Sequence, residues 1–197
     1  MRPCIIALSK SSRIQDKIAV LDAGADDFLS EPMNRDEFKA RITAHIRRNF
    51  ENSLNENTML FDDKITYKML KRAVNSGKNR AFMLISIEKL GDYKEIYGEF
   101  AADKILQTCS AVIKSALSAD DYTGHLQKDN FIVITGNEKA ERIANYIIYT
   151  FDTAVSKFYN KSDNERGYIF LHGDDEAENK TGFVYLSIGV ITNQYTK

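Results

Sequence analysis

The side chains that most often hold metal ions are few in this sequence and widely spaced. Cys4 and Cys109 lie far apart among apolar residues, which predicts two buried free thiols. His45 and His172 have no cysteine or histidine partner at ligand spacing, so solvated positions are expected for both. The acidic run at 174–176 lacks the glycine and the terminal glutamate of a calcium-binding loop. These residue types and spacings therefore predict no zinc or calcium site.

The composition is that of an ordinary soluble globular chain. Of its 197 residues, 43% are hydrophobic and 28% are charged, and the formal net charge is -1. That charge gives no electrostatic reason to expect a nucleic-acid or membrane partner. No stretch approaches the roughly 20 apolar residues of a membrane span, and the N-terminus has no secretory signal. We therefore expect a cytoplasmic protein with one large domain or two small ones.

The first 50 residues alternate between short apolar runs and helical patterns. Residues 4–8 and 27–29 are apolar runs that predict two short buried strands. Residues 14–21 between them have helical spacing, and a second helix is expected from a cap at Asn34 to about Asn52. This order predicts a parallel β-α-β-α unit, which is too small to bury a core alone.

The rest of the chain predicts a second set of strands and helices. Residues 51–60 are polar and lack a strong period, which predicts a linker or a continuing helix. Beyond them, apolar periodicity predicts helices at 65–74, 105–116 and 143–158, and strands at 82–87, 131–134, 168–171 and 183–188. The last two strands enclose a polar, acidic loop. The overall class is therefore α/β or α+β.

Residues 3–50 resemble the second half of a response-regulator receiver domain. The resemblance is carried by an apolar strand ending in Ser9, a Gly-Ala-Asp-Asp-Phe-Leu stretch at 24–29, and Pro32. It implies that Ser9 stands where the family's hydroxyl contacts a phosphoryl group, and that Phe28 is the switch aromatic.

Glu31 is the departure from this receiver pattern. The family has lysine there, whose ammonium pairs with phosphoryl oxygens, and a carboxylate would repel them. The phosphoacceptor aspartate belongs to the first half of the fold, which residues 1–50 do not contain. The resemblance therefore implies a receiver segment that is not phosphorylated in the usual way.

Residues 57–195 resemble the GGDEF family, the diguanylate cyclases. The Ser-Ile-Glu-Lys-Leu-Gly stretch at 86–91 falls where the family has Asp-x-Asp-x-Phe-Lys, and Tyr-Gly at 97–98 follows in register. The Gly-His-Leu-Gln-Lys-Asp-Asn-Phe stretch at 124–131 resembles the signature hairpin, Gly-His-Ile-Gly-Gly-Asp-Asp-Phe in one subgroup. A Ser-Ile-Gly-Val-Ile-Thr-Asn tail at 187–193 matches the same subgroup. The resemblance implies a mainly antiparallel sheet flanked by helices, with residues 82–87 and 131–134 as neighbouring strands.

Metal binding is the first function that this resemblance puts in doubt. The family joins two GTP molecules with the help of Mg²⁺, which prefers carboxylate and phosphate oxygens. The first metal-binding aspartate is Ser86 here, while Glu88 occupies the second acidic position and Asp129 survives in the hairpin. We therefore expect neither catalysis nor a metal site, and Mg²⁺ and GTP only if residual family activity remains.

Nucleotide binding is weakened as well. Gln127 and Lys128 replace the hairpin glycines that let the backbone approach the nucleotide, and Asn130 replaces an acid before Phe131. The resemblance implies three further nucleotide contacts. Lys94 replaces the family's guanine-binding asparagine, and Asp103 is retained at the guanine-contacting aspartate position. Asp121 is the aspartate of the Arg-x-x-Asp product site, whose arginine is lost here. The family's last helix is expected beyond the last residue of this sequence.

Three functions remain open from the sequence. The first is a catalytically inactive GGDEF domain (61–197) behind a receiver half (1–50), which signals through protein contacts as a homodimer or with another signalling protein. The second is a receptor that binds GTP or cyclic di-GMP without turnover. The third is a weak cyclase that uses Glu88 and Asp129 for metal. In each of them His125 is expected to be a structural turn residue, because the subgroup has histidine there beside an intact active site.

Overall fold

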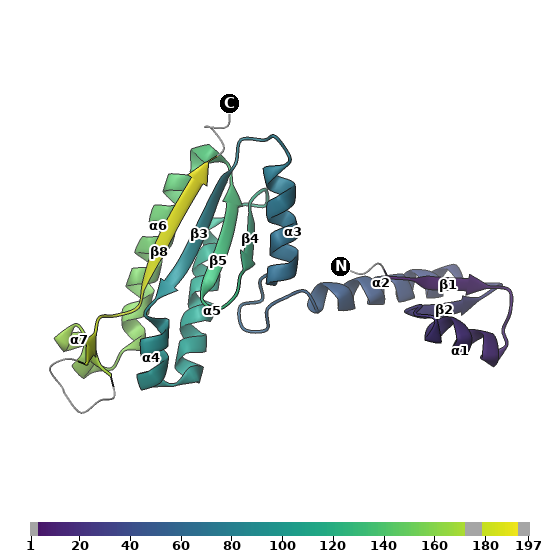
Figure 1. The fold of residues 1–197 in the computed structure, drawn as a ribbon, viewed down its shortest axis with the longest axis horizontal. Coiled ribbons are helices and arrows are strands. Elements are labelled where there is room, and N and C mark those ends of the chain that lie inside the picture. The colour runs from purple at the N-terminus through teal and green to yellow at the C-terminus, as the bar shows by residue number, and fades with distance from the viewer. Residues whose placement is uncertain (1–3, 172–178, 193–197) are drawn as a thin grey trace. The chain divides into compact units, whose positions relative to one another are not determined.

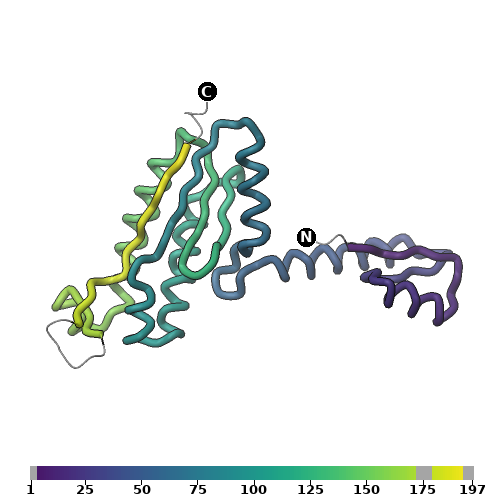
Figure 2. Tube along the Cα trace, in the orientation of Figure 1, coloured from purple at the N-terminus to yellow at the C-terminus, as the bar shows by residue number. Residues whose placement is uncertain are grey.

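The computed structural model describes residues 4–171 and 179–192, and these divide into two compact units, 1–53 and 54–197. Figures 1 and 2 trace the chain. The expectations for His172, for the acidic residues 174–176 and for Asn193 fall outside the described residues. Each unit is considered by itself below.

The first unit is a parallel β-α-β-α segment. Strands β1 (Ile6–Ser9) and β2 (Asp27–Ser30) pair in parallel and are connected through helix α1 (Ile14–Asp22), which confirms the predicted arrangement. Helix α2 (Arg35–Glu51) starts where the Asn34 side chain accepts hydrogen bonds from two backbone N–H groups of the first turn. The fold class predicted for this segment is therefore correct.

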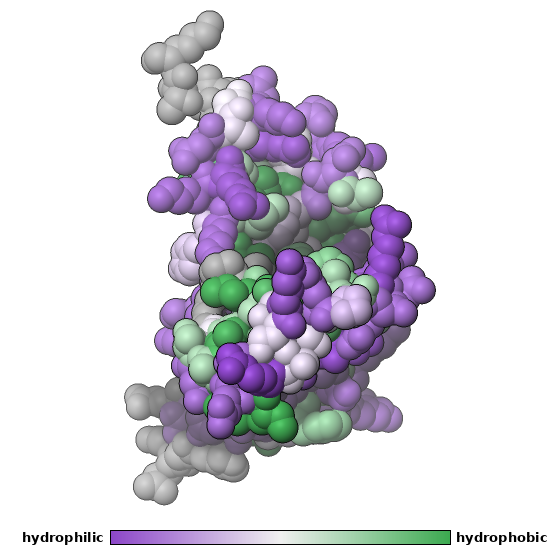
Figure 3. Space-filling view, turned by 90° about the vertical axis from the view of Figure 1, so that its right-hand side faces the viewer, coloured by the Kyte–Doolittle hydropathy of each residue, from purple (hydrophilic) through white to green (hydrophobic). Residues whose placement is uncertain are grey.

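The first unit buries little of its apolar surface. Phe28 and Leu29 are its buried hydrophobic residues, and neither α1 nor α2 has a buried residue. Ile14 is 73% exposed and Ile46 is 65% exposed. Figure 3, seen from the side of this unit, shows green apolar side chains at the surface among purple polar ones.

Two expectations for this unit are wrong. Cys4 is exposed rather than buried, because it precedes β1 at the rim of an open groove between β1 and α2. His45 is only 12% exposed rather than solvated, because its Nε2 lies 3.2 Å from Oδ2 of Asp27. The sequence pattern gave no information about this partner on β2.

The second unit is built on a four-stranded antiparallel sheet in the order β4-β5-β3-β8. Its strands are β3 (Ala81–Glu88), β4 (Tyr122–His125), β5 (Asn130–Thr135) and β8 (Tyr185–Thr192). Strand β3 pairs with β5 on one side and with β8 on the other, so the predicted neighbours at 82–87 and 131–134 are confirmed.

Helices cover both faces of this sheet (Figure 1). Helix α3 (Asp63–Val74) packs on β4 and β5, while α5 (Glu99–Ala116) and α6 (Asn137–Val155) lie on the opposite face. Because β5 is covered from both sides, five of its six residues are buried. Gly124 permits the close approach of α3, since a Cβ there would meet the Thr66 side chain.

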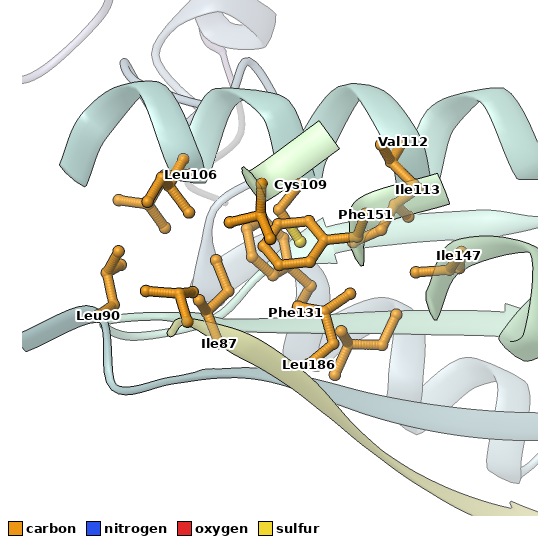
Figure 4. Close-up of a cluster of buried hydrophobic side chains, with 14 of the residues drawn as sticks. Ile87, Leu90, Leu106, Cys109, Val112, Ile113, Phe131, Ile147, Phe151 and Leu186 are labelled. Carbon is orange, nitrogen blue, oxygen red and sulfur yellow. The ribbon is translucent and has the colours of Figure 1, made fainter. Parts of the chain in front are cut away.

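The core lies between the sheet and helices α5 and α6. Figure 4 shows Phe131 and Phe151 among the aliphatic side chains of the neighbouring strands and helices. Both rings and Cys109 are fully buried, and the prediction of a buried thiol is correct for Cys109.

Short elements complete the second unit. They are helix α4 (Leu90–Tyr97), the 3-10 turn η1 (Ser156–Phe158), helix α7 (Lys161–Arg166) and the two-residue strands β6 (Ile169–Phe170) and β7 (Lys180–Thr181). Residues 54–61 form a closed turn in which the Asn55 side chain accepts the backbone N–H groups of Asn57 and Thr58. This turn is bridged to Gly124 through Phe61, so it belongs to the second unit.

Candidate functional site

The end of β3 and the start of β5 bring the first pair of expected site residues together. Ser86 and Asn130 are direct partners in the ladder, and the Ser86 hydroxyl donates a 2.6 Å hydrogen bond to Oδ1 of Asn130. The backbone N–H of Ile87 donates to the carbonyl of Asp129 at 3.1 Å. Ser86 therefore lies beside the 128–129 turn, as the motif spacing predicted.

The hairpin turn between β4 and β5 is closed by its own backbone. Leu126 N–H donates to the carbonyl of Asn130 at 2.8 Å, and Nδ2 of Asn130 donates to the carbonyl of Gln127 at 3.1 Å. Lys128, at a glycine position of the family hairpin, has a φ of 61°. This left-handed conformation favours glycine, so a lysine there carries local strain. The side chains of Gln127 and Lys128 are exposed.

His125 supports this turn from inside the domain. It is 5% exposed, its ring stacks on Phe131, and its Nε2 donates to the carbonyl of Lys128 at 2.6 Å. Its Nδ1 lies 3.1 Å from the hydroxyl of Thr58 in the closed turn at 54–61. Nε2 thus holds the backbone of the hairpin turn and Nδ1 contacts a hydroxyl of the closed turn, which is the structural role expected for this histidine.

A pocket of about 380 Å³ opens beside the hairpin turn. Its polar lining comes from the closed turn, α4, α5 and the hairpin: Asn57, Lys94, Glu99, Asp103, Lys128 and Asp129. Lys94 Nζ lies 2.7 Å from Oε1 of Glu99, and Nδ2 of Asn57 donates to Oδ1 of Asp103 at 2.9 Å. We refer to it below as the hairpin pocket.

Charges in the hairpin pocket influence one another. Burial raises the pKa of Asp129 above its usual range, against the opposite effect of Lys128 and Lys94. The hydrogen bond that Lys94 donates to Glu99 raises the pKa of Lys94, and the carboxylates of Asp103 and Asp129 add to that effect. The pocket thus pairs Lys94 with one of its own carboxylates.

Other expected site residues lie outside this lining. Ser86 and Glu88 do not line the hairpin pocket, and Oε1 of Glu88 accepts a 2.7 Å hydrogen bond from the Ser187 hydroxyl on β8. Phe131 is fully buried in the core. Within residues 4–171 and 179–192, no three acidic, histidine or cysteine side chains gather closely enough to hold a metal ion.

Asp121 also lies outside the hairpin pocket, where it stabilises a loop. Its side chain is 1% exposed and accepts hydrogen bonds from the backbone and hydroxyl of Ser118, at 2.9 and 2.6 Å, and from the Thr135 hydroxyl at 2.7 Å. Lys139 Nζ lies 3.4 Å away. These donors outweigh the effect of burial and lower the pKa of Asp121 to about 2.

The receiver-like residues lie together at the ends of β1 and β2. The hydroxyl of Ser9 accepts from the backbone of Ser11 at 3.1 Å, and the carbonyl of Ser9 accepts from the backbone of Glu31 at 2.7 Å. Phe28 is buried, with Lys17 5.7 Å from its ring centroid. The backbone of Glu31 therefore lies beside Ser9, and the Glu31 side chain is exposed.

Sequence reasoning missed the polar residues that tie the closed turn to the hairpin pocket. The Thr58 carbonyl accepts from the Ser110 hydroxyl at 2.7 Å and from Lys114 Nζ at 3.0 Å. Asn57 was also missed, although it bonds to Asp103. The only signal in the sequence was Asn55 two residues before Asn57, a spacing typical of Asx turns.

Comparison with known families decides the assignment of the second unit. Residues 54–170 match the family described as the diguanylate cyclase, GGDEF domain. The chain belongs to the GGDEF family. This GGDEF match contains β3, the hairpin and the hairpin pocket, so the antiparallel sheet and its flanking helices are the family fold.

Solved structures with GGDEF domains have the same fold. The coiled coil and GGDEF domain of DgcB from Caulobacter crescentus, in complex with c-di-GMP, gives a TM-score of 0.58 at 15% identity. That comparison covers 92% of this chain and 83% of the DgcB chain. Diguanylate cyclase SiaD from Pseudomonas aeruginosa, in complex with its activator SiaC, gives 0.55 at 11% identity over 93% of this chain and 61% of the other.

Curated response regulators are also similar to the chain. The KDP operon transcriptional regulatory protein KdpE of Escherichia coli is 35% identical over 79 residues, which is 40% of this chain. The chain spans about a third of the length of this relative (35%). Receiver homology together with a GGDEF domain makes the chain a signal-transduction module of the kind linked to cyclic di-GMP. Among the described residues, no helix combines the length and apolarity needed to cross a membrane.

Proposed function

We propose that this GGDEF domain is catalytically inactive and that the chain signals through protein contacts. The observation that carries the proposal is the hydrogen bond between Ser86 and Asn130. At these positions the resemblance implies a metal-binding carboxylate and a second acid. Two neutral groups that satisfy each other need no cation between them, and they offer Mg²⁺ none of the charge it prefers.

The remaining donors fit Mg²⁺ poorly. Of the positions that the resemblance assigns to metal binding, Asp129 lines the hairpin pocket, and its pKa is raised by burial. Glu88 is engaged by Ser187 on the neighbouring strand. A two-metal reaction on phosphates needs several carboxylates close enough together to share the metal ions, and the described residues contain no such cluster.

The hairpin pocket also disfavours a triphosphate without metal. Glu99, Asp103 and Asp129 contribute three carboxylates, while Lys94 and Lys128 contribute two ammonium groups. A GTP molecule would add several negative charges to a lining that already has more acidic than basic groups. Lys94 also stands where the family's asparagine recognises guanine, and an ammonium lacks the acceptor of an amide.

A receptor function is the second candidate. Asp103 is retained at the guanine-contacting position, and it lines the hairpin pocket beside Asn57. Titration calorimetry with GTP and with cyclic di-GMP separates the candidates. Heat of binding that disappears in Asp103→Asn favours the receptor, and its absence favours contact signalling alone.

We expect the purified chain to make no cyclic di-GMP from GTP with Mg²⁺ or Mn²⁺. The measurement is chromatographic separation of the products after long incubation, beside a reaction without protein. The matched variant carries Ser86→Asp and Asn130→Asp, which restores both acids while leaving Gln127 and Lys128 in place. Product from the unaltered chain above the blank would show that the proposal is wrong.

A further inference from the structure

Strand β8 forms one edge of the four-stranded sheet, and within residues 4–171 and 179–192 no further strand pairs with it. Its ladder to β3 runs without a break from Tyr185, opposite Glu88, to Thr192, opposite Ala81. Five of its eight residues are exposed, and Figure 1 shows it as the outermost arrow of the sheet, with α6 behind it. Because alternate residues of an edge strand turn their N–H and C=O groups away from the neighbouring strand, β8 presents a row of backbone donors and acceptors to the outside.

The other edge of the same sheet is protected, whereas β8 is not. Strand β4 has four residues, and the closed turn lies along it, since Phe61 bridges to Gly124 and the Phe61 carbonyl accepts from the backbone of His125 at 2.8 Å. The eight residues of β8 include no charged residue and no proline, and their register contains no bulge. Short length, charges, proline and bulges are the features by which edge strands avoid pairing with another chain. Strand β8 is therefore suited to accept an added strand.

Apolar side chains lie on both faces of this edge. Val190 shares the face of its ladder partner Met83, which is fully buried in the core, yet Val190 is 45% exposed. Tyr185 and Ile191 lie on the opposite face and are 47% and 73% exposed. A strand added beside β8 would cover all three, and cross-strand contacts of aromatic and β-branched side chains stabilise such a pairing.

The cations of α6 lie away from β8. Arg142 and Tyr146 line a small pocket together with Ser115 of α5, so this flank of α6 faces α5. The Lys139 Nζ lies on the same flank, 3.4 Å from the Asp121 carboxylate. Neither positive charge of the helix is therefore available at the edge of the sheet.

The opposite flank of α6 is acidic. Glu141, Ile148 and Asp152 share one side of the helix, because they are separated by seven and four residues. Since α6 packs on β8 and has α5 on its other side, this flank borders the free edge of β8. Both carboxylates are exposed, and Ile148 is 36% exposed. On the side of the helices, the edge is thus bordered by two negative charges and an apolar side chain.

We propose that β8 binds an extended basic segment of a partner protein as a fifth strand of the sheet. Lysines or arginines at alternate positions of the segment lie on the α6 side, where their stems cover Val190 and their charges reach Glu141 and Asp152. The residues between them are apolar and lie beside Tyr185 and Ile191. A second copy of β8 is a poorer occupant, because two-fold pairing would bring two acidic flanks together.

The open edge does not depend on the proposed loss of catalysis, because it contains no residue of the hairpin pocket. A chain that made cyclic di-GMP would present the same strand to a partner. Analysis of the nucleotide products and measurement of peptide binding therefore test the two proposals separately.

Fluorescence anisotropy with labelled eight-residue peptides tests the proposal on the whole chain. The probe alternates lysine with valine and tyrosine. A second peptide has the same composition with its lysines grouped at one end, and a third has glutamate in place of lysine. We expect the alternating basic peptide to bind at least about tenfold more tightly than either of the others. Amide hydrogen exchange in β8 should slow at saturation, since an added strand provides acceptors for its outward N–H groups.

Variants of the chain test the acidic flank and the edge. Glu141→Gln combined with Asp152→Asn should weaken binding of the alternating basic peptide by at least about fivefold. The matched control, Glu95→Gln with Glu165→Gln, removes two exposed carboxylates from α4 and α7 and should change the affinity by less than about twofold. Val190→Lys places a positive charge on the edge and should weaken binding at least about tenfold. Circular dichroism of each variant verifies that the fold is kept.

Equal binding of the alternating and grouped peptides would indicate general charge attraction and overturn the proposal, as would equal losses in the two double variants. The absence of binding, or binding without slower exchange in β8, would also overturn it. Exchange in β8 that slows with rising protein concentration, without any peptide, would identify a second copy as the occupant and exclude the basic partner.

Discussion

Lys128 holds a backbone conformation that a lysine adopts only at a cost. Its φ of 61° lies in the left-handed region, where a Cβ is disfavoured by about 1 kcal/mol. The carbonyl of the same residue accepts from the buried His125, so the turn is held in this shape by the domain beneath it. The hairpin therefore holds a lysine in a conformation that favours glycine, the residue that the family resemblance implies at this position.

Replacing this lysine should therefore stabilise the protein. We expect Lys128→Gly to raise the free energy of unfolding by about 0.5–1 kcal/mol, since glycine adopts the left-handed region without strain. Urea denaturation followed by circular dichroism measures the change. Lys128→Ala is the control, because it removes the charge and keeps the Cβ. If the alanine variant is as stable as the glycine variant, backbone strain is not the cause.

The second prediction concerns the pH dependence of the stability that Asp121 contributes. Its pKa in the folded protein is about 2, below the usual value of 3.8. A carboxylate whose pKa is lowered in the folded protein adds stability at pH values above its unfolded-state pKa. That added stability is lost as the pH falls from about 4 toward 2. At neutral pH we expect Asp121→Asn to cost on the order of 2 kcal/mol. The difference between wild type and variant should shrink toward zero near pH 2, and a difference independent of pH would contradict the assignment.

At the scale of elements, periodicity identified the long helices and strands, and it failed for the short ones. Helix α4 was missed because it is short and starts after Lys89, whose left-handed backbone offers no side-chain cap. The sequence did contain a signal for helix α7, because Asn160 is a common N-cap residue. In the structure its side chain accepts the backbone N–H of Asp163. The helix expected at 143–158 ends at Val155, where the chain tightens into η1.

The lining of the hairpin pocket could be predicted from the sequence only in part. Lys94, Asp103 and Asp129 line it as the motif register implied. Asp121 was expected near the ligand, yet its carboxylate is engaged by Ser118 and Thr135. A motif fixes where a residue stands along its element, but the partners of its side chain come from loops whose course the sequence did not indicate.

A cluster around Asp163 joins α4 to α7. The carboxylate accepts from the Tyr97 hydroxyl, from Arg166 and from Nδ2 of Asn160, and its side chain is 7% exposed. Removing it leaves three donors without their shared acceptor, among them the half-buried Tyr97 hydroxyl. We therefore expect Asp163→Ala to destabilise the protein by about 1–3 kcal/mol. Thermal unfolding measures the loss.

Glu165 on the same helix provides the control for this cluster. Its ion pair with Lys161 is 3.8 Å long and largely exposed, so Glu165→Ala should change stability by less than about 0.5 kcal/mol. Similar losses in both variants would mean that α7 is sensitive to any change, rather than dependent on the Asp163 cluster.

At the scale of the whole molecule, the two units differ in how well they bury their apolar residues. The second has a continuous core, whereas the first leaves a groove of about 300 Å³ between β1 and α2 that is lined by Ile6, Leu8 and Ile46. An open strand edge beside exposed apolar side chains favours association with another chain. The proposed signalling through contacts places the interface here.

We therefore expect the chain to dimerise through the first unit. Ile46→Asp, at a residue that is 65% exposed on α2, should raise the dimer dissociation constant at least about tenfold. Light scattering across a concentration series measures it. Ile191→Asp, at a residue of the second unit that is 73% exposed, adds the same charge elsewhere and should leave the dimer intact. A monomer at all concentrations for the unaltered chain would exclude this role.

The bond between Ser86 and Asn130 also determines what each restored acid would cost. Because the two residues face each other across β3 and β5, they form a matched neutral pair. Ser86→Asp removes the hydroxyl that donates to Asn130, so the bond within the pair is lost. Asn130→Asp keeps an acceptor for the Ser86 hydroxyl, but it removes the Nδ2 donor that holds the Gln127 carbonyl of the hairpin turn. Either single change to aspartate therefore loses one hydrogen bond while providing only one of the two acids.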